Sequence, residues 1–480
     1  MSKLKGLKPE RVFHYFEEIS NIPRGSGNMK GISDYCLDFA ISQSLKYYRD
    51  DANNVIIKKP ASKGYEDKAP IILQGHLDIV CQKTAESNKD FLKDGLDLLI
   101  DGDFIKADGT TLGADNGIAV AMVLAILEDN TISHPAIEAV FTTDEEIGMI
   151  GAGKLDFGLL KGKRMINLDS EEEDVLTVSC AGGSDFEAIL PVKRENFNGY
   201  KVEIILKGLK GGHSGVEIHK GRVNADILAG RIVNRLKAVC DFSLIAINGG
   251  DKSNVITNQC SIEFCTKTPE ILVSEAEKYL SLLSAEIKER ESGFAPEIRC
   301  LTEGNYSVLD KKSENDLIFI LSCVPNGVIT MSAEIEGLVE TSLNLGILKT
   351  EEDSVLLHHA LRSNKSSALE FLEEKLKRFY SFSDIKYNKF GHYPPWEFKE
   401  NSALQSVYKK VYKDVTGKEI KVEAIHAGLE CGIFSAGIPG IDCIAIGPEL
   451  SDVHTVNETL SIPSTAVIYE ILLKILAELQ

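Results

Sequence analysis

The sequence lacks the features that mark a membrane-spanning or exported chain. No apolar run approaches the roughly 20 residues that a transmembrane helix requires. The opening residues, MSKLKGLKPERVF, contain no apolar signal core and no small-residue cleavage site. The ten cysteines are scattered without close CxxC spacing, which in a chain without an export signal is typical of reduced core thiols. We therefore expect a cytoplasmic protein that has no membrane partner.

The chain also lacks an excess of basic residues. Its 53 lysines and arginines are outnumbered by 72 aspartates and glutamates, for a net charge of −19. Such a surface repels phosphate backbones and anionic lipids, so we expect no nucleic-acid partner, and most of the charge serves solubility. Low-complexity segments and short-period repeats are absent as well, which argues against a linker-rich or solenoid protein.

The length of the chain and the change in its predicted secondary structure indicate two domains. A chain of 480 residues exceeds one ordinary domain. Short β-branched runs alternate with helical patterns at both ends, which predicts an α/β domain with a mixed, mainly parallel sheet and helices on both faces. Longer alternating strands and amphipathic helices fill the middle. We predict a discontinuous catalytic domain over residues 1–186 and 384–480, with an α+β domain inserted over residues 187–383.

Apolar periodicity predicts the individual elements. The clearest helices are expected at Lys8–Ser20, Asn28–Ser44, Asn116–Glu128, Asn224–Val239, Leu272–Arg290, Asn401–Val415 and Ser464–Leu479. The clearest strands are expected at Val55–Ile57, Ile71–Gln74, Ile137–Thr142, Met165–Leu168, Lys201–Lys207, Thr341–Leu348 and Cys443–Ile446.

Five residues of metal-binding types lie where a predicted strand ends or, in one case, where a helix begins. They are His76 in IILQGHLDIV, Asp115 in LGADNG, Glu146 in TTDEEIG, Asp169 in MINLDS and His454 in SDVHTV. Parallel α/β sheets bind ligands outside the carboxyl ends of their strands. Two histidines and three carboxylates that converge there would hold two divalent metal ions, with one carboxylate shared between them. This donor set is suited to metal-assisted hydrolysis.

Several of these residues also have an ordinary structural explanation. His76 alone fits a loop histidine, Asp115 fits a helix N-cap, and the acidic turn at Glu145 and Glu146 fits a solvated loop. A metal site is favoured because metal-type residues follow apolar runs four times and open an apolar helix once. Two neighbours then gain roles: Asp78 lies on the same side of the strand as His76 and can orient its imidazole, while Glu145 diverges from Glu146 and can face the attacking water.

His213 differs from the other histidines because glycines flank it in KGGHSG. It fits an ordinary loop before a helix, but it can also present an imidazole donor to an oxyanion. His426, in IHAGLECG, lies in a glycine-containing loop near the second half of the predicted site.

The ordered set of motifs resembles the M20-type dinuclear metallopeptidases, and within them the aminoacyl-histidine dipeptidases, also called cytosolic nonspecific dipeptidases. The resemblance runs over nearly the whole chain. It rests on GHLDIV, TLGADNGIA, TTDEEIGMIGA, NLDSEE, CAGGSD, KGLKGGHSG, IHAGLECGIF and the GP…H segment. It implies a phosphorylase/hydrolase-like catalytic domain that carries an inserted lid domain.

The resemblance also implies a role for each residue of the predicted centre. Asp115 would bridge the ions, His76 and Asp169 would hold one, and Glu146 and His454 would hold the other. Glu145 would be the general base and Asp78 would orient His76. The Asp115–Asn116 peptide bond is expected to be cis, as it is in many relatives.

Three further residues are implied to bind substrate from the lid. His213 would polarise the scissile carbonyl, and Asn254 and Arg362 would hold the substrate carboxylate. Glu430 would lie near the substrate amine. The inserted region is about twice the size of the lid in simpler relatives, which dimerise through it and borrow the histidine from the partner. We therefore expect either a homodimer through this domain or a contact within one chain.

The resulting hypothesis is hydrolysis of unblocked dipeptides, including Xaa-His dipeptides, with two Zn²⁺ ions that Co²⁺ or Mn²⁺ can replace. Two rivals share the metal centre: an N-acyl amino acid deacylase and a tripeptidase. A third alternative is a metal-dependent binding protein without turnover, and a fourth treats the acidic residues as surface charge.

Overall fold

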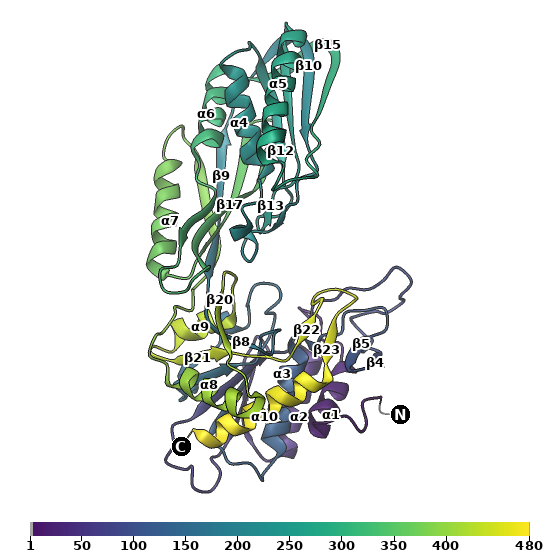
Figure 1. Ribbon diagram of the computed structural model, residues 1–480, viewed down its shortest axis with the longest axis vertical. Helices are drawn as coiled ribbons and strands as arrows, with labels where there is room; N and C mark the ends of the chain where they lie inside the picture. Colours follow the sequence, from purple (N-terminus) through teal and green to yellow (C-terminus); the bar gives the residue numbers. More distant parts are fainter. Residues whose placement is uncertain (1–2, 480) are drawn as a thin grey trace. The chain divides into compact units, whose positions relative to one another are not determined.

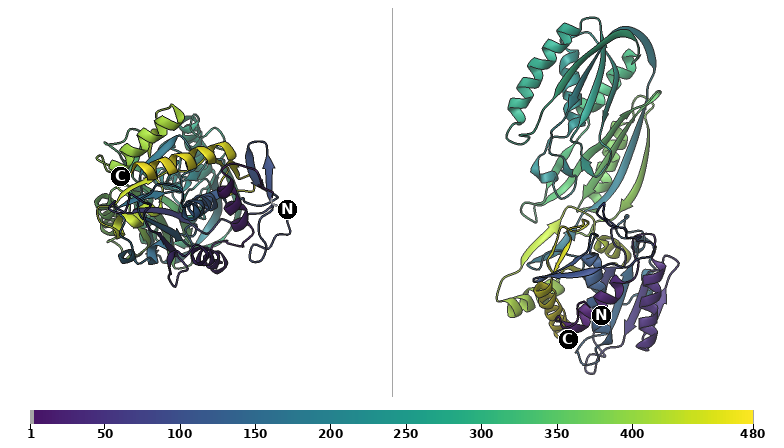
Figure 2. Two further views of the ribbon diagram at one scale, coloured as in Figure 1. Left: turned by 90° about the horizontal axis from the view of Figure 1, so that it is seen from below. Right: turned by 90° about the vertical axis from the view of Figure 1, so that its right-hand side faces the viewer.

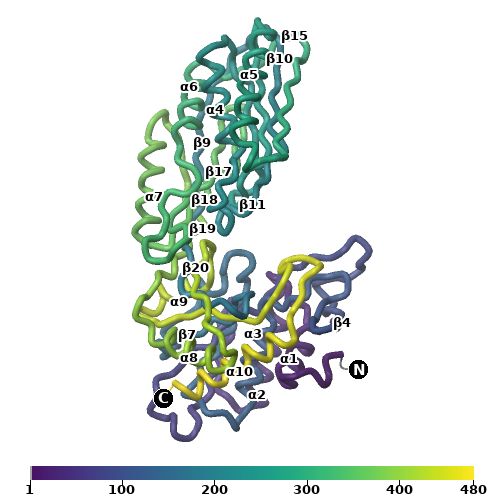
Figure 3. Tube along the Cα trace, in the orientation of Figure 1, coloured from purple at the N-terminus to yellow at the C-terminus, as the bar shows by residue number. Residues whose placement is uncertain are grey.

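The computed structural model describes residues 3–479, which divide into two compact units. The first unit comprises residues 3–180, 396–424 and 429–479, and the second comprises residues 181–395 and 425–428. Both ends of the chain, purple and yellow in Figure 3, belong to the first unit. The sequence predicted an inserted domain over residues 187–383. The second unit is larger because β9 (Gly182–Pro191) and β19 (Lys386–Tyr393) pair with each other, and this pairing places both strands in the sheet of that unit.

The first unit is built on an eight-stranded mixed sheet (Figure 1). Its strand order is β1 (Lys46–Arg49), β2 (Val55–Lys59), β6 (Ile137–Thr142), β3 (Ile71–His76), β7 (Arg164–Asn167), β21 (Asp442–Ala445), β8 (Val175–Cys180) and β20 (Lys421–Ile425). The central strands β6, β3, β7 and β21 are parallel, whereas the pairs β1–β2, β2–β6 and β21–β8 are antiparallel. The prediction of a mixed, mainly parallel sheet is confirmed as to the mixed sheet, in which the parallel pairs form the centre.

The central strands and α3 (Ala114–Glu128) form the core of this unit. Every residue of β3 and of β6 is buried, as expected for strands covered on both faces. Helix α3 is buried from Asn116 to Leu127, which explains why its sequence is apolar all round. The other helices of the unit are α1 (Glu10–Ser20), α2 (Lys30–Ser42), α8 (Ala403–Thr416), α9 (Glu430–Gly437) and α10 (Ile462–Glu478).

A small four-stranded sheet completes the first unit. Its order is β22 (Leu450–Ser451), β23 (Thr459–Ser461), β5 (Phe104–Ala107) and β4 (Leu98–Asp101). The loop between β22 and β23 carries His454, so this sheet fixes both ends of that loop.

The second unit is a nine-stranded sheet with helices packed against it (Figure 2). Its path is β15 (Glu297–Leu309), β10 (Arg194–Leu206), β14 (Cys260–Thr266), β12 (Ser243–Gly249), β17 (Val339–Thr350), β18 (Ser354–Ser363), β9 and β19, with β16 (Gly327–Met331) paired to β17. A short ladder joins β11 (Gly212–His213) to β13 (Val255–Ile256). The helices are α4 (Ala225–Lys237), α5 (Pro269–Ile287), α6 (Lys311–Cys323) and α7 (Ser366–Phe379).

One apolar core lies between these helices and the sheet. Strand β10 shows the alternation that this arrangement requires, because Val202, Ile204 and Leu206 are buried while the residues between them are partly exposed. None of the helices within residues 3–479 combines the length and the apolar character needed to cross a bilayer.

Candidate metal centre

The five predicted ligands come together at the carboxyl ends of the central parallel strands of the first sheet. His76 ends β3, Glu146 follows β6, and Asp169 follows β7. These three strands are parallel neighbours, with His76 in register with Thr142 and Gln74 in register with Asn167. Their carboxyl ends therefore lie side by side. Asp115 enters from the start of α3, and His454 enters from the loop between β22 and β23.

Asp115 lies between the two histidines and faces each with a different oxygen. Its Oδ1 is 3.1 Å from His76 Nε2, and its Oδ2 is 3.0 Å from His454 Nε2. Asp169 Oδ1 lies 3.5 Å from His76 Nε2 on the first side, and Glu146 Oε1 lies 3.0 Å from His454 Nε2 on the second. The five side chains thus form two adjoining groups that share one carboxylate.

This donor set fits a pair of divalent metal ions. Ligand atoms of His76, Asp115 and Glu146 lie within 4.8 Å of one another. His76 Nδ1 lies 3.1 Å from the backbone carbonyl oxygen of Asp78. A proton on Nδ1 satisfies that contact and leaves the Nε2 lone pair directed at the centre, which is the tautomer that a ligating histidine needs.

The local backbone places Asp115 in this position. The Asp115–Asn116 peptide bond is cis, as expected from the resemblance. Asp115 and Asn116 have non-helical backbone angles at the start of α3, and no side chain caps that helix at Gly113. Asn116 ties the neighbouring elements together: its Nδ2 donates to the backbone oxygen of Leu168 and to Asp169 Oδ1, both at 2.8 Å.

The Asp78 carboxylate contacts the acidic turn at Glu145 and Glu146 as well as the His76 ring. Its carboxylate accepts hydrogen bonds from the backbone N–H of Glu145 at 3.0 Å and of Glu146 at 3.1 Å, and from the Ser26 hydroxyl at 2.8 Å. Its Oδ1 is 3.5 Å from His76 Nδ1, farther than its own backbone oxygen. The side chain therefore positions the two glutamates more directly than it positions the imidazole.

The electrostatics of the centre reflect buried carboxylates beside histidines. Burial raises the pKa of Glu145 well above its ordinary value, and the charge of Asp169 adds to this while His76 opposes it. Hydrogen bonds to Asp115 and Glu146 raise the pKa of His454 to about 11. Burial alone would raise the pKa of Asp115, but hydrogen bonds from His454 and His76 hold it below the ordinary value.

Two buried residues that no sequence pattern marked support the backbone around the centre. Glu458, 3% exposed, accepts hydrogen bonds from four consecutive backbone N–H groups, those of residues 112–115. Arg24, 1% exposed, donates to the backbone oxygens of Leu77 at 3.0 Å and Gly113 at 2.6 Å. Gly117 leaves room for this arginine, because a Cβ there would lie 2.3 Å from Arg24 Nη2.

Glu430 lies close enough to the centre for His76 to influence its pKa, and its place near the substrate amine stays a prediction. It is the first residue of α9, and its side chain is fully buried. Its Oε2 accepts hydrogen bonds from Gln74 and from the Thr142 hydroxyl. Burial raises the pKa of Glu430 to about 7.

The three residues predicted to bind substrate all lie in the second unit. His213 is in register with Val255, and the neighbouring Ser214 N–H donates to the backbone oxygen of Asn254 at 2.9 Å. A Cβ on Gly215 would lie 2.9 Å from His213 Cε1 and 3.1 Å from Arg362 Nε. His213 and Arg362 therefore meet around this glycine, and Asn254 adjoins them through the backbone.

The hydrogen bonds of His213 identify its tautomer. The backbone N–H groups of Gly215 and Val216 both point at Nδ1, at 3.2 Å. Nδ1 must accept, so the proton is on Nε2. Burial and the charge of Arg362 lower the pKa of His213, which keeps the ring neutral. The structure thus presents an Nε2–H donor.

His426 belongs to the second unit although it lies late in the chain. Its Nε2 is 2.7 Å from the Ser342 hydroxyl, and its Nδ1 is 3.1 Å from Asn364 Oδ1. The ring is 5% exposed, and burial lowers its pKa to about 3. It anchors the segment 425–428 to strand β17 and to the end of β18.

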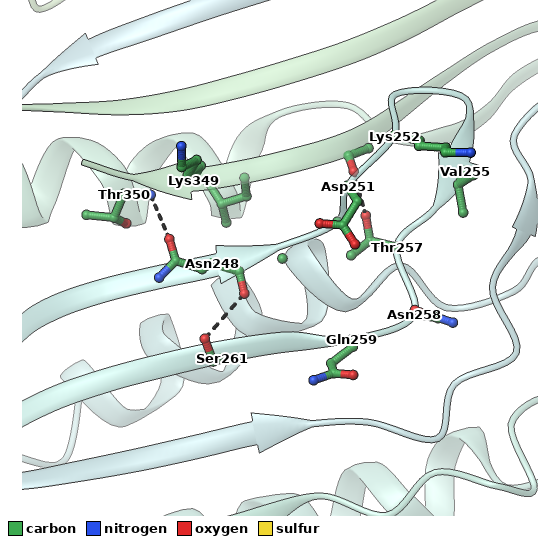
Figure 4. Close-up of a pocket in the computed structure, with 14 residues that line it drawn as sticks. Asn248, Asp251, Lys252, Val255, Thr257, Asn258, Gln259, Ser261, Lys349 and Thr350 are labelled. Atoms are coloured by element: carbon green, nitrogen blue, oxygen red, sulfur yellow. Dashed lines mark hydrogen bonds between the residues drawn. The ribbon is translucent and has the colours of Figure 1, made fainter.

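A polar hollow of about 760 Å³ lies beside the Asn254 segment (Figure 4). It forms where β12 and β17 pair only through Gly249 and Leu348. Side chains complete the ladder there: the Thr350 N–H donates to Asn248 Oδ1 at 2.8 Å. None of the predicted site residues lines this hollow.

Comparisons with known proteins match most or all of the chain. A family model described as peptidase family M20/M25/M40 matches residues 72–478. The chain is 36% identical to the cytosol non-specific dipeptidase of Escherichia coli (strain K12), with 100% of this chain and 99% of that protein aligned. The structure of aminoacylhistidine dipeptidase from Vibrio alginolyticus matches with a TM-score of 0.90 at 34% identity, covering 99% of this chain and 98% of that one. The aminopeptidase PepT of Bacillus cereus shares the fold, with a TM-score of 0.59 at 16% identity over 98% of this chain and 99% of that one.

Proposed function

This chain belongs to peptidase family M20/M25/M40, and from that premise we propose that it is a metallodipeptidase that hydrolyses unblocked dipeptides, including Xaa-His dipeptides. Two relatives similar over their whole length are named a cytosol non-specific dipeptidase and an aminoacylhistidine dipeptidase. The observation that carries the proposal is the shared carboxylate of Asp115, which faces His76 with one oxygen and His454 with the other.

Two divalent ions would be held by these residues. His76 and Asp169 would hold one ion, Glu146 and His454 would hold the other, and Asp115 would contact both. The mixed nitrogen and oxygen donors favour Zn²⁺ and also accept Co²⁺ or Mn²⁺. When bound, such ions polarise a carbonyl group and make water nucleophilic at neutral pH.

Glu145 would move the proton. It adjoins Glu146, and its backbone is fixed by Asp78. Its carboxylate accepts a proton from the attacking water and then gives that proton to the nitrogen of the departing amino acid, so one side chain serves both halves of the reaction.

The second unit would bind the substrate. The Nε2–H of His213 donates to the oxygen of the scissile carbonyl as negative charge develops on it. Arg362 takes the substrate carboxylate, to which its planar guanidinium offers parallel hydrogen bonds, and Asn254 adds a polar contact. Arg362 Nη1 is held by the Tyr393 hydroxyl at 2.8 Å, which pre-orients the guanidinium.

The likeness to the Escherichia coli relative also supports a proposal for the cellular compartment. The Escherichia coli relative is called a cytosol enzyme, and we propose the same compartment for this chain. Association of two copies through the second unit stays a prediction, which sedimentation of the purified chain tests.

Metal analysis combined with a substrate panel tests the proposed function. The purified chain, freed of metal and reloaded with Zn²⁺, is expected to bind two ions per chain and to cleave Ala-His and Leu-Gly. A tripeptide and an N-acetylated amino acid complete the panel. Preference for either of these would replace the proposal with a tripeptidase or a deacylase, and two bound ions without cleavage of any compound would indicate a binding protein.

A further inference from the structure

One buried side chain on β17 holds the turn that bears Asn254. Asn344 is 1% exposed, and its Nδ2 donates to the backbone oxygen of Ser253 at 2.9 Å and to that of Val255 at 2.8 Å. Figure 4 shows Val255 and Lys252 on the loop that contains this turn. Asn254 itself is exposed, so few packing contacts can orient its side chain, and the orientation depends on the backbone.

Three consecutive carbonyl groups around Asn254 are held by hydrogen bonds. The Ser253 oxygen belongs to the peptide unit before Asn254, and Asn344 holds it. The unit after Asn254 is held through its own oxygen, which accepts the Ser214 N–H at 2.9 Å. The next unit is held through the Val255 oxygen, again by Asn344. Because peptide units are planar, these bonds fix the direction in which the Asn254 side chain leaves the backbone.

The same turn is tied to the segment that bears His213. Strand β11 pairs with β13, with His213 in register with Val255. The bond from the Ser214 N–H to Asn254 continues this pairing. A displacement of the turn therefore also displaces the backbone beside His213.

The contacts of Asn344 require an amide side chain. Its NH₂ group supplies one N–H to each of the two carbonyl oxygens, and its Oδ1 accepts the Asn224 Nδ2 at 3.2 Å. Asn224 is the N-cap of α4, and its Nδ2 also donates to the Leu345 oxygen at 2.7 Å. An ionised carboxylate in place of the amide would face two carbonyl oxygens without a donor, and an apolar side chain would leave both oxygens unsatisfied.

The backbone of β17 is shaped to receive the turn. A Cβ on Gly346 would lie 2.5 Å from the Ser253 oxygen, so only glycine lets the turn approach this closely. The register between β17 and β18 shifts between Leu345 and Ile347, which makes Gly346 the extra residue of a β-bulge. Bulges often lie next to functional sites, where they redirect side chains. Here the bulge follows Asn344 by two residues and lies against the turn that Asn344 holds.

We propose that Asn344 is a positioning residue for substrate binding, which keeps Asn254 and His213 in the geometry in which they contact the dipeptide. This inference rests on the proposed dipeptidase function and on the roles assigned there to these two residues. The two N–H groups and the oxygen of Asn344 are engaged by the protein, so it acts through the turn and not by touching the substrate.

The first test is a double-mutant cycle on the full-length, Zn²⁺-loaded protein with Leu-Gly as substrate. Asn344→Ala is expected to lower kcat/KM about 100-fold, the cost of displacing a binding group by about 1 Å. Asn254→Ala is expected to lower it about 10–100-fold, the loss of one hydrogen bond to a charged group. In the double variant the loss should be far smaller than the product of the two, because a side chain that has been removed cannot be misplaced.

Hydrogen exchange measured by mass spectrometry tests the geometry without turnover. Peptides that cover residues 211–216 and 251–257 should exchange faster in Asn344→Ala than in the unmodified protein, while α10 in the first unit keeps its rate. Asn344→Asp is the second variant, for use if the alanine variant does not fold. It keeps the shape and the acceptor for Asn224 but lacks both donors when ionised, so the same changes are expected.

Asn326 provides the matched control. Its Oδ1 accepts the Leu345 N–H at 2.8 Å, so it is also an amide bonded to β17, through a contact that does not involve the Asn254 turn. Asn326→Ala is expected to keep kcat/KM and the exchange rates of both peptides, even where it lowers the melting temperature. Zinc content and far-ultraviolet circular dichroism show whether each variant is loaded and folded.

The outcomes separate the two proposals. Overlapping losses in the cycle together with faster exchange of both peptides support the positioning role. If the unmodified protein cleaves Leu-Gly but the two losses multiply, Asn254→Ala has no effect, exchange is unchanged or Asn326→Ala behaves as Asn344→Ala does, the positioning role is overturned and the dipeptidase function stands. If the unmodified protein cleaves neither Leu-Gly nor Ala-His, both proposals are overturned.

Discussion

Glu458 holds the backbone of Asp115 although 343 positions separate them in the sequence. Its Oε1 accepts the N–H of Asp115 at 3.4 Å and of Ala114 at 2.9 Å, while Oε2 accepts those of Gly113 at 3.0 Å and Leu112 at 2.8 Å. Glu458 follows His454 by four residues. One buried carboxylate thus couples the segment that presents the shared ligand to the segment that presents His454.

Replacing this carboxylate is expected to weaken both the fold and the metal site. Glu458→Gln turns an amide NH₂ toward N–H donors and leaves buried groups unsatisfied, which costs about 1–3 kcal/mol. Loss of such supporting contacts typically lowers metal affinity about 10–100-fold. Thermal unfolding in chelator and Zn²⁺ competition with a chromophoric chelator measure the two effects. Glu449→Gln, at an exposed position nearby, is the control, and equal behaviour of the two variants would contradict the role.

The proposed proton transfer makes a separate prediction for Glu145. Glu145→Gln keeps the size of the side chain but removes its proton acceptor, so kcat for Leu-Gly is expected to fall by about 10²–10⁴-fold. Zinc content, measured by plasma mass spectrometry, should stay at two ions per chain because Glu145 is not among the proposed ligands. A fully active variant would refute the assignment.

The contacts of Asp78 predict that its loss affects rate more than metal binding. The backbone oxygen of Asp78, which a substitution leaves in place, is the nearer partner of His76 Nδ1. Asp78→Asn removes one of the acceptors for the N–H groups of Glu145 and Glu146. We expect kcat to fall about 10–100-fold with zinc retained in dialysis, whereas zinc loss would show that the carboxylate mainly supports His76.

The proposed role of the His213 Nε2–H as an oxyanion donor predicts that removing it lowers the rate of catalysis without loss of metal. His213→Ala removes the Nε2–H donor and should lower kcat about 10²–10³-fold, the usual effect of one oxyanion donor. His219→Ala, at an exposed position in the same segment, is the matched control and should behave as the unmodified protein. Steady-state kinetics with Leu-Gly at saturating zinc distinguishes them, and an unchanged kcat in the His213 variant would exclude the role.

The sequence predicted the centre because its ligands follow strong local signals. His76, Glu146 and Asp169 each end or follow an apolar strand of a parallel sheet, and parallel order alone brings their ends together. Asp115 precedes a helix that is apolar all round, which is the signature of burial. The residue roles inferred from the resemblance remain proposals.

The supporting residues could not be predicted because no local pattern marks them. Glu458, in VNETL, looks like a surface acid, and Arg24 looks like a loop cation; each acquires its role only when distant backbone segments approach. The predicted ends of some helices also differ from the observed ones. The helix predicted at Leu272–Arg290 is α5 (Pro269–Ile287), because Pro269 is accepted in the first turn, where its missing N–H is not needed.

Asp226 in the second unit predicts a pH-dependent stability that is independent of the metal centre. It lies at the start of α4, and burial raises its pKa to about 7, although the Cys260 thiol and the Thr257 hydroxyl nearby partly oppose this. Gly249 leaves room for it, because a Cβ there would lie 2.0 Å from Asp226 Oδ1. The folded state therefore holds a proton that the unfolded chain, with an ordinary pKa of 3.8, releases.

The direction of the effect follows from proton linkage. Well below pH 3.8 both states are protonated, and Asp226 has no influence. Between about pH 4 and 7 unfolding releases the proton, so stability falls as pH rises, by roughly 4 kcal/mol in total. Asp226→Asn cannot ionise, so its gain in stability over the unmodified protein should be small at pH 4.5 and larger at pH 8, where the variant should unfold at a higher temperature. Calorimetry in chelator measures both, with Asp241→Asn as an exposed control in the same unit; a variant that is destabilised equally at both pH values would show that the carboxyl group is needed for packing and not for its proton.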